Sequence, residues 1–309
     1  MSTLHEQTEN PHYKAGYVAI IGEPNVGKST LMNAMLKQKI SIVTDKPQTT
    51  RHKILGFLSG ENYQIVFLDT PGMIQPKYLL QEMMMRNASS ALGDADIALL
   101  LVDAEKLKRG EYDEHGPAFQ AIRDAKKKTF LAINKIDKVK KAELLPMIDR
   151  FSKAFLFDEI FLLSALKNEG MEGLVSSIVR DLPEHPPFYP PDIVSEAPEK
   201  FFVSEIIREK IFELYSQEIP YSTTVDIVAF EEKGKKKHFI GAEVYVERQS
   251  QKGILIGKGG AALKALGEKS RVDIERFLSH PVYLELHVKV RENWRSEDSW
   301  LKRLRYENN

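Results

Sequence analysis

Short apolar segments alternate with helical patterns in the first part of the chain. These segments are β-branched or leucine-rich throughout, which is typical of strands covered on both faces of a parallel sheet. Apolar residues at helical spacing separate them, as at Leu31, Met35 and Leu36. We predict strands at residues 16–21, 63–68, 97–102, 129–133 and 160–163. This alternation predicts an α/β fold with a mostly parallel sheet.

The last third of the chain has a different order of elements. Residues 199–215 read as an amphipathic helix, and residues 282–290 alternate cleanly between apolar and polar positions, as a strand does. The remaining predicted elements are strands at 223–230 and 240–246 and helices at 251–256 and 261–278. The order α-β-β-α-α-β predicts a second, smaller α+β domain.

A proline-rich segment separates the two patterns. Its six prolines lie between Leu182 and Glu199, where they exclude a helix or a central strand. We predict an N-terminal tail at 1–14, a first domain at 15–182, a linker at 183–198 and a second domain at 199–309. The alternative is a long loop within one domain.

A glycine-containing motif follows the first predicted strand and opens a helix. Its sequence fits G-x-x-x-x-G-K-[ST], whose backbone N–H groups wrap phosphates at a helix N-terminus. Lys28 would reach the β- and γ-phosphates, and Ser29 would ligate Mg²⁺. The candidate contact residues are Gly22, Glu23, Pro24, Asn25, Val26, Gly27, Lys28, Ser29 and Thr30.

Three further motifs follow later strands of the same predicted sheet. Asp137, in the run Asn134-Lys135-Ile136-Asp137, could accept hydrogen bonds from guanine N1–H and its exocyclic amine, a donor pair that adenine lacks. The other two motifs are Asp69-Thr70-Pro71-Gly72, for Mg²⁺ and the γ-phosphate, and the weaker Ser164-Ala165. Carboxyl ends of parallel strands meet at one sheet edge, so the motifs together predict a guanine-nucleotide site. The alternative interpretation of these motifs is an ATPase.

These motifs, together with Lys-Pro-Gln-Thr-Thr-Arg-His at 46–52, resemble the Era family of bacterial GTPases. The resemblance implies a P-loop GTPase domain that binds GTP, GDP and Mg²⁺, with residues 46–52 as its first switch loop. It implies catalytic roles for Lys28, Thr50 and Gly72, and metal ligation by Ser29, Thr50 and Asp69. We favour Thr50 over Thr49 as the switch threonine.

Met73 stands where related GTPases place a glutamine that orients the attacking water. A thioether cannot do this, so we expect slow intrinsic hydrolysis. Asn25 could help to hold a potassium ion, as in some similar GTPases, or could simply brace its loop.

A second glycine loop lies between the paired helices of the last third. Its position resembles the GxxG loop of type II KH domains, which clamps about four nucleotides of single-stranded nucleic acid. The candidate RNA-binding residues are Ile256, Gly257, Lys258, Gly259, Gly260 and Lys264. The Era resemblance implies binding near the 3′ end of 16S ribosomal RNA and a role in small-subunit processing and assembly.

Other residues of the last third leave alternatives open. The lysines at 235–237 could touch RNA phosphates or keep a sheet edge soluble. Trp294 and Trp300 could stack on bases but more simply anchor the C-terminal segment. Lys302, Arg303 and Arg305 suggest an alternative function, a GTP-dependent switch that docks on a protein or on the inner face of the cell membrane.

The composition of the chain limits which kinds of chemistry, cellular location and RNA recognition are possible. The chain has no cysteine, which excludes disulfides and a thiol nucleophile and fits the cytoplasm. Its 44 basic and 44 acidic residues cancel, but residues 199–309 hold 20 basic and 18 acidic residues. Zero net charge therefore excludes only an RNA recognition mode that rests on bulk positive charge. We expect a monomer.

Overall fold

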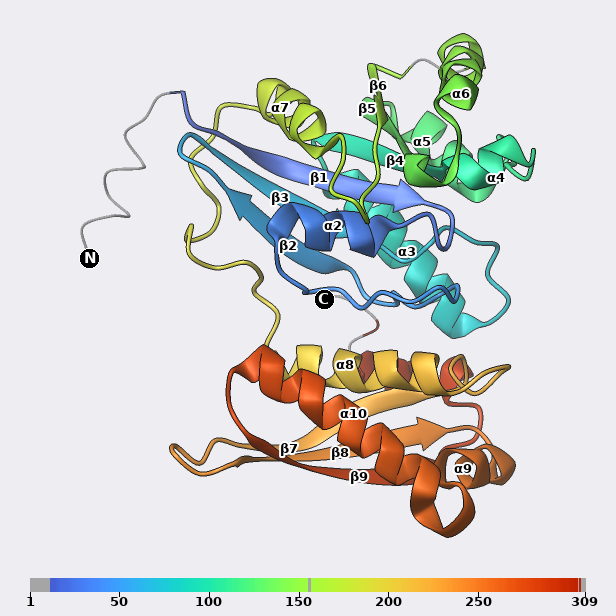
Figure 1. Cartoon of the computed structure of the whole chain (residues 1–309), viewed down its shortest axis with the longest axis vertical. Helices are drawn as coiled ribbons and strands as arrows, with labels where there is room; N and C mark the ends of the chain where they lie inside the picture. The colour runs from blue at the N-terminus through green and yellow to red at the C-terminus, as the bar shows by residue number, and fades with distance from the viewer. Residues whose placement is uncertain (1–11, 155–156, 305, 307–309) are drawn as a thin grey trace. The chain divides into compact units, whose positions relative to one another are not determined.

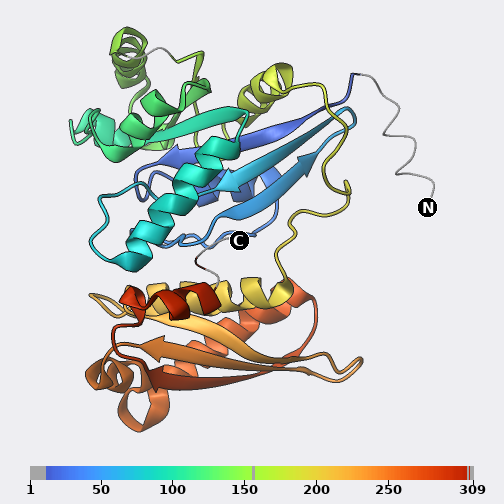
Figure 2. The same cartoon turned by 180° about the vertical axis from the view of Figure 1, so that it is seen from behind.

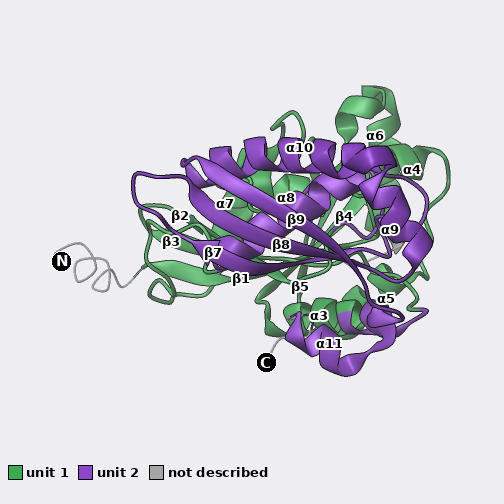
Figure 3. Cartoon of the chain, turned by 90° about the horizontal axis from the view of Figure 1, so that it is seen from below, with its two compact units in different colours: residues 1–41, 50–76, 84–196 green, residues 42–49, 77–83, 197–309 purple. Residues whose placement is uncertain are grey.

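The computed structural model describes residues 12–154, 157–304 and 306, so most of the predicted tail lies outside them. The chain divides into two compact units, coloured separately in Figure 3. Unit 1 comprises residues up to 41, 50–76 and 84–196. Unit 2 comprises residues 42–49, 77–83 and 197 onward. Each unit has its own sheet.

The sheet of unit 1 has helices on both faces. Its strand order is β2-β3-β1-β4-β5-β6, and β2 is antiparallel to β3 while the other neighbours are parallel. Helices α2 and α7 lie on one face (Figure 1) and α3 lies on the other (Figure 2). The elements are β1 (Lys14–Gly22), α2 (Lys28–Leu36), β2 (Ile54–Ser59), β3 (Tyr63–Asp69), α3 (Leu79–Asp94), β4 (Ile97–Asp103), α4 (Ala104–Lys108), α5 (Pro117–Ala125), β5 (Lys128–Asn134), η2 (Ile136–Lys138), α6 (Lys141–Ala154), β6 (Glu159–Leu162) and α7 (Met171–Asp181).

The five predicted strands of unit 1 are confirmed, and their apolar runs explain their positions. All seven residues of β4 are buried, as the central strand of a sheet covered on both faces requires. Strand β2 was not predicted, because Gly56 interrupts its apolar pattern. A Cβ on Gly56 would lie 2.6 Å from Leu36 Cδ1, so glycine lets α2 pack against this strand.

The proline-rich segment is extended, and much of it is held against the sheet of unit 1. Gln64 is fully buried, and its Oε1 accepts hydrogen bonds from the backbone N–H groups of Phe188 (2.8 Å) and Tyr189 (3.0 Å). The Tyr189 ring stacks on Phe57 with 3.9 Å between centroids. Residues 183–196 accordingly group with unit 1. The predicted linker bounds stay a prediction.

Unit 2 carries a three-stranded sheet in the order β7-β8-β9. Strand β8 is antiparallel to β7 and parallel to β9. Ile240, Ala242 and Val244 are fully buried in the same apolar core as residues of α8 and α10. The elements are α8 (Glu199–Leu214), β7 (Thr224–Glu231), β8 (His238–Val246), α9 (Gln249–Ile256), η3 (Lys258–Gly260), α10 (Ala261–Leu278), β9 (Val282–Val290), η4 (Trp294–Ser296) and α11 (Asp298–Arg303). The predicted order α-β-β-α-α-β is confirmed, whereas η4 and α11 were not predicted.

Candidate functional site

The glycine-containing loop between β1 and α2 is closed by Lys28. Its ammonium group donates to the carbonyl oxygens of Gly22 (3.2 Å) and Glu23 (2.9 Å), and the residue is 6% exposed. Gly27 precedes α2 with φ of 100°, and a Cβ there would lie 2.4 Å from the Asn134 amide nitrogen. Only glycine fits this position. Since no side chain caps α2, its first backbone N–H groups suit an anion.

Burial makes the charged form of Lys28 unfavourable in the nucleotide-free protein. Desolvation lowers the pKa of Lys28 to about 8, and the negative charges of Asp69 and Glu23 oppose this effect only in part. Phosphate would supply the missing negative charge.

We expect the Lys28→Met variant, without nucleotide, to be more stable than the parent at pH 7. Unfolding releases Lys28 from its unfavourable environment, so the parent carries a penalty of up to about 3 kcal/mol. The unfolded state binds the extra proton between pH 8 and about 10.5, so this advantage of the variant should shrink across that window. Urea titrations at several pH values measure it, and an advantage that does not change with pH would contradict the assignment.

Three oxygen-bearing side chains meet beside Lys28. Ser29 Oγ donates to Asp69 Oδ2 at 2.7 Å and lies 2.8 Å from Thr50 Oγ1. Asp69 is fully buried, and its Oδ1 has no hydrogen-bond partner among the described residues. Desolvation raises the pKa of Asp69. A buried carboxylate with one unused oxygen and two hydroxyl groups nearby fits the ligand preference of Mg²⁺.

The two candidate switch threonines have different contacts. Thr49 Oγ1 lies 2.6 Å from Thr44 Oγ1 and donates to Lys46 O at 2.8 Å, so its hydroxyl stabilises its own loop. Thr50 is the one whose hydroxyl reaches Ser29. This arrangement favours Thr50 for the metal.

Asn134, at the end of β5, braces the site on two sides. Its amide nitrogen donates to Val26 O at 2.8 Å, and its Oδ1 accepts from the backbone N–H of Ala165 at 3.0 Å. The residue is 2% exposed. These contacts show that Asn134 holds the phosphate loop and the Ser164-Ala165 loop together.

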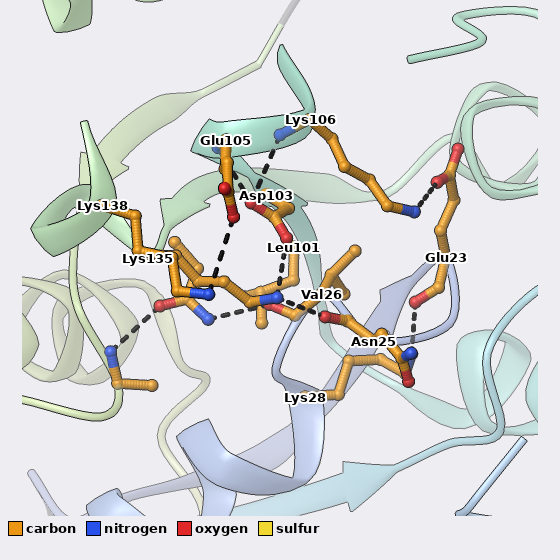
Figure 4. A network of polar contacts seen from close by, with 12 residues as sticks. Glu23, Asn25, Val26, Lys28, Leu101, Asp103, Glu105, Lys106, Lys135 and Lys138 are labelled. Atoms are coloured by element: carbon orange, nitrogen blue, oxygen red, sulfur yellow. Dashed lines mark hydrogen bonds and ion pairs between the residues drawn. The ribbon is translucent and has the colours of Figure 1, made fainter. Parts of the chain in front are cut away.

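Lys135 and Asp137 follow Asn134 and point to different partners. Lys135 Nζ contacts Asn25 O (2.6 Å) and Asp103 Oδ2 (2.7 Å), as Figure 4 shows. Asp137 is exposed, and its Oδ1 accepts a 2.5 Å hydrogen bond from Ser164 Oγ. Ser164 thereby orients the carboxylate that was predicted to read the base.

Two contact residues of this network were missed by sequence reasoning. Asp103 ends β4, caps α4 through the N–H groups of Glu105 and Lys106, and pairs with Lys135. Lys106 forms a 3.1 Å ion pair with Glu23 of the phosphate loop (Figure 4). The signal for Asp103 was available, because it directly follows a wholly apolar strand on the same sheet edge.

The Asp69–Gly72 run also lies against the phosphate loop. Thr70 Oγ1 donates to Ile20 O at 2.8 Å, which makes Thr70 a fixed part of the sheet edge. The N–H of Met73 donates to Gly22 O at 3.0 Å, so Gly72 and Met73 lie beside the loop. Met73 is only 7% exposed.

The second glycine loop has the backbone that its sequence predicts. Gly257, Gly259 and Gly260 all have positive φ, of 71°, 59° and 80°. Lys258 and Gly259 are exposed between α9 and α10. The exposed loop at the start of α10 offers backbone N–H groups and one lysine to a phosphate.

Apolar residues around this loop divide between exposed, partly buried and core positions. Leu255 and Leu266 are fully buried, whereas Ile254 is 50% exposed and Ile256 and Leu263 are partly buried. Lys264 is exposed on the first turns of α10. The exposed members could contact bases, and the buried ones pack the core.

The C-terminal tryptophans are anchors, as the simpler interpretation held. Trp294 is fully buried and its Nε1 donates to Ser222 O at 2.9 Å. Trp300 is 5% exposed, with the guanidinium groups of Arg291 and Arg303 over its ring at 4.0 and 4.6 Å.

No helix among the described residues is long and apolar enough to cross a membrane.

Within unit 2, residues 42–49 are held by α8. Lys46 Nζ donates to the carbonyl oxygens of Phe212 and Tyr215 at the end of that helix. Arg208 donates to Thr49 O, and the N–H of Val43 donates to Glu209 at 3.0 Å. A lysine beside the last carbonyl groups of a helix is electrostatically favourable.

Comparisons with known proteins identify the families of both domains. Residues 17–135 match the family described as 50S ribosome-binding GTPase, and residues 218–295 match the KH domain. GTPase Era of Alkaliphilus metalliredigens is 45% identical over 96% of this chain and 99% of its own length. The chloroplastic GTPase ERA1 of Zea mays is 46% identical, over 96% of this chain and 71% of its own.

Two solved structures have the same fold over nearly the whole chain. Era of Aquifex aeolicus bound to GDP and AlF4⁻ matches with a TM-score of 0.89 and 38% identity, covering 96% of this chain and 100% of its own. Era in complex with MgGDPNP and nucleotides 1506–1542 of 16S ribosomal RNA matches with a TM-score of 0.90 at the same identity and coverage. The chain is therefore a GTPase of the Era family, with a P-loop GTPase domain followed by a KH domain.

Proposed function

We propose that this GTPase binds the 3′ region of 16S ribosomal RNA and acts in processing and assembly of the small ribosomal subunit. The observation that carries the proposal is the exposed GxxG loop of unit 2 in the same chain as the candidate nucleotide site. It is supported by the full-length likeness to Era in complex with nucleotides 1506–1542 of 16S ribosomal RNA.

In the nucleotide site, we assign phosphate contacts to the loop from Gly22 to Thr30, with Lys28 on the β- and γ-phosphates. Ser29, Thr50 and Asp69 would hold Mg²⁺, which would neutralise charge that develops between those phosphates. Gly72 would sense the γ-phosphate through its N–H group. Asp137 would read guanine, and Ser164 and Asn134 would fix the loops that carry the base contacts.

Nucleotide state would influence unit 2 through the backbone of the switch loop. Thr50 lies beside Ser29, which is also a proposed Mg²⁺ ligand. The carbonyl oxygen of the preceding residue, Thr49, accepts a hydrogen bond from Arg208 of α8. Binding of a γ-phosphate and Mg²⁺ to Thr50 would therefore also act on Thr49, which is covalently joined to Thr50 and hydrogen-bonded to α8.

The attacking water needs a group other than Met73, and Asn25 could help by holding a potassium ion. We expect GTP turnover to be about tenfold or more faster in KCl than in NaCl at equal ionic strength. The Asn25→Ala variant should lose this difference and keep the lower rate. Steady-state phosphate release measures both rates. Equal turnover of the parent in the two salts would remove the cation from the mechanism.

The experiment that tests the proposed function is crosslinking of the purified chain to total cellular RNA, with GDP and with a non-hydrolysable GTP analogue. We expect recovery of the 3′ region of 16S ribosomal RNA, in amounts that depend on the nucleotide. Recovery of no defined RNA in either state would overturn the proposal. A monomeric state and a cytoplasmic location belong to the same proposal.

Docking on a membrane is not favoured by the basic residues that suggested it. Lys302 pairs with Asp298 at 3.0 Å, and Arg303 lies 3.4 Å from Asp226. Arg305 lies outside the described residues. Charges that already have acidic partners attract anionic lipid only weakly.

A further inference from the structure

The hairpin between β7 and β8 carries a run of unpaired positive charge. Lys235, Lys236 and Lys237 are exposed, and none of them forms an ion pair with a described residue. The hairpin lies at one end of the unit 2 sheet, and α9 lies at the other (Figure 1). It is thus separate from the GxxG loop that follows α9.

Two stacked histidines fix the shape of this hairpin. The rings of His238 and His280 are 3.7 Å apart and inclined by 14°. His238 Nδ1 accepts from the N–H of Lys233 at 3.1 Å, and His280 Nε2 donates to Lys236 O at 2.9 Å. Lysines that only keep an edge soluble need no such bracing, whereas a phosphate contact benefits from a preorganised loop.

A pair of aromatic rings, Phe239 half-buried and Tyr283 exposed, lies next to the hairpin on the sheet face opposite the core. Phe239 and Tyr283 are cross-strand partners whose rings are 6.0 Å apart and inclined by 17°. Tyr283 is 58% exposed, and Lys233 Nζ lies 5.4 Å from the centre of the Phe239 ring. Ile240, the next residue of β8, is fully buried on the core side. Lys233 itself pairs with Glu231 at 3.1 Å, so the exposed Tyr283 ring offers a stacking surface next to the hairpin that carries the unpaired lysines.

We propose that this surface, formed by Lys235, Lys236, Lys237, Phe239 and Tyr283, is a second contact site for single-stranded RNA. The lysines would contact phosphates, and a base would stack on Tyr283. The inference rests on the proposed RNA binding and extends it, because it assigns RNA a path beyond the GxxG loop. RNA is favoured over lipid because a flat aromatic ring can stack on a base, whereas a lipid headgroup offers the lysines only negative charge.

The separation of the two sites sets the length of RNA that can reach both. Helix α10 has 18 residues and starts at the GxxG loop, so it spans about 27 Å to its end beside His280. A stacked strand advances about 3.4 Å per nucleotide, so about eight nucleotides cover this span. An RNA of about four nucleotides fills only the GxxG loop, and one of about 12 nucleotides reaches both sites.

The test compares binding of two single-stranded RNAs of these lengths by fluorescence anisotropy across a range of KCl concentrations. Replacing Lys235, Lys236 and Lys237 together with serine should lower the slope of log K against log [salt] by about 2 for the long RNA and leave the short RNA unchanged. The matched control replaces the exposed Lys126, Lys140 and Lys141 of unit 1 with serine and should leave both slopes at the parent value.

A second variant separates stacking from charge. Tyr283→Thr keeps a residue that favours strands, so unit 2 should fold, and it should weaken the long RNA by roughly 5- to 150-fold without changing the salt slope. Parent-like binding of the long RNA by both variants would overturn the inference. So would a lysine variant that binds RNA normally but loses binding to phosphatidylserine-containing vesicles.

The same experiment distinguishes this inference from the proposed function. If the parent binds neither RNA, the proposed RNA binding fails and the second site fails with it. If Gly259→Asp abolishes binding of both RNAs while the hairpin variants match the parent, the GxxG site stands and the second site alone is wrong.

Discussion

Replacing Asp137 with asparagine should change the nucleotide that the protein selects from guanine to xanthine. An asparagine oxygen still accepts the N1–H of the base, but its amide donates a hydrogen and so matches the 2-oxo group of xanthine instead of the 2-amino group of guanine. A site that leaves such polar groups unpaired rejects the wrong base by about 10⁴-fold. GTP affinity should fall by that order while xanthosine triphosphate binds.

Displacement of a fluorescent guanine nucleotide by GTP, ATP and xanthosine triphosphate measures this change. Asp149→Asn is the matched control, because Asp149 is an exposed carboxylate of α6 that pairs with Lys153 and lies outside the nucleotide motifs. Its nucleotide preference should equal that of the parent. An Asp137→Asn variant that still prefers GTP, or that selects ATP, would contradict the assignment of the base-reading residue.

Gly259→Asp should abolish RNA binding through the GxxG loop while GTP hydrolysis without RNA stays at the parent rate. A Cβ on Gly259 would meet no heavy atom within 4 Å, so a side chain fits. Aspartate also tolerates the left-handed backbone that φ of 59° requires better than most residues. Its charge would face the RNA phosphates, and like charges cost several kcal/mol, so affinity should fall about 100-fold or more.

Gly259→Asn separates charge from shape in this prediction. Asparagine has nearly the same size and the same backbone preference as aspartate but carries no charge. Anisotropy titrations with RNA should therefore show much weaker loss for the asparagine variant, and phosphate release should be equal in all three proteins. Equal loss in both variants would mean that the loop tolerates no side chain and that charge is not the reason.

Much of the fold could be predicted because its strands are apolar on both faces. The apolar runs at β1, β3, β4 and β5 lie mostly buried in the sheet, as their patterns predict, and the apolar run at β6 forms a partly buried edge strand. β2 lies at the sheet edge and has a glycine where α2 packs, so its pattern resembles a loop. The pairing of Gln64 with the proline-rich segment could not be predicted either, because it joins residues more than a hundred positions apart.

The candidate site could be predicted where its residues are adjacent in sequence. The phosphate loop and the base-reading run each form one motif, so spacing was enough to find them. The partner of a given side chain could not be found in this way. The resemblance favoured Thr50 over Thr49, but the contact of its hydroxyl with Ser29 is visible only in the fold. The pairing of Lys135 with Asp103 likewise depends on two strands being neighbours.

The position of Asn134 has a consequence for how the protein is made. This residue joins Val26, 108 positions before it, to Ala165, 31 positions after it. Synthesis proceeds from the N-terminus, and domains generally fold as units. A nascent chain from which only β1 and the phosphate loop have emerged therefore lacks Asn134, which holds the phosphate loop in place. The ability to bind GTP should therefore arise only after about half of the chain has been made and the Ser164-Ala165 loop has left the ribosome, so shorter truncated chains would not compete for nucleotide.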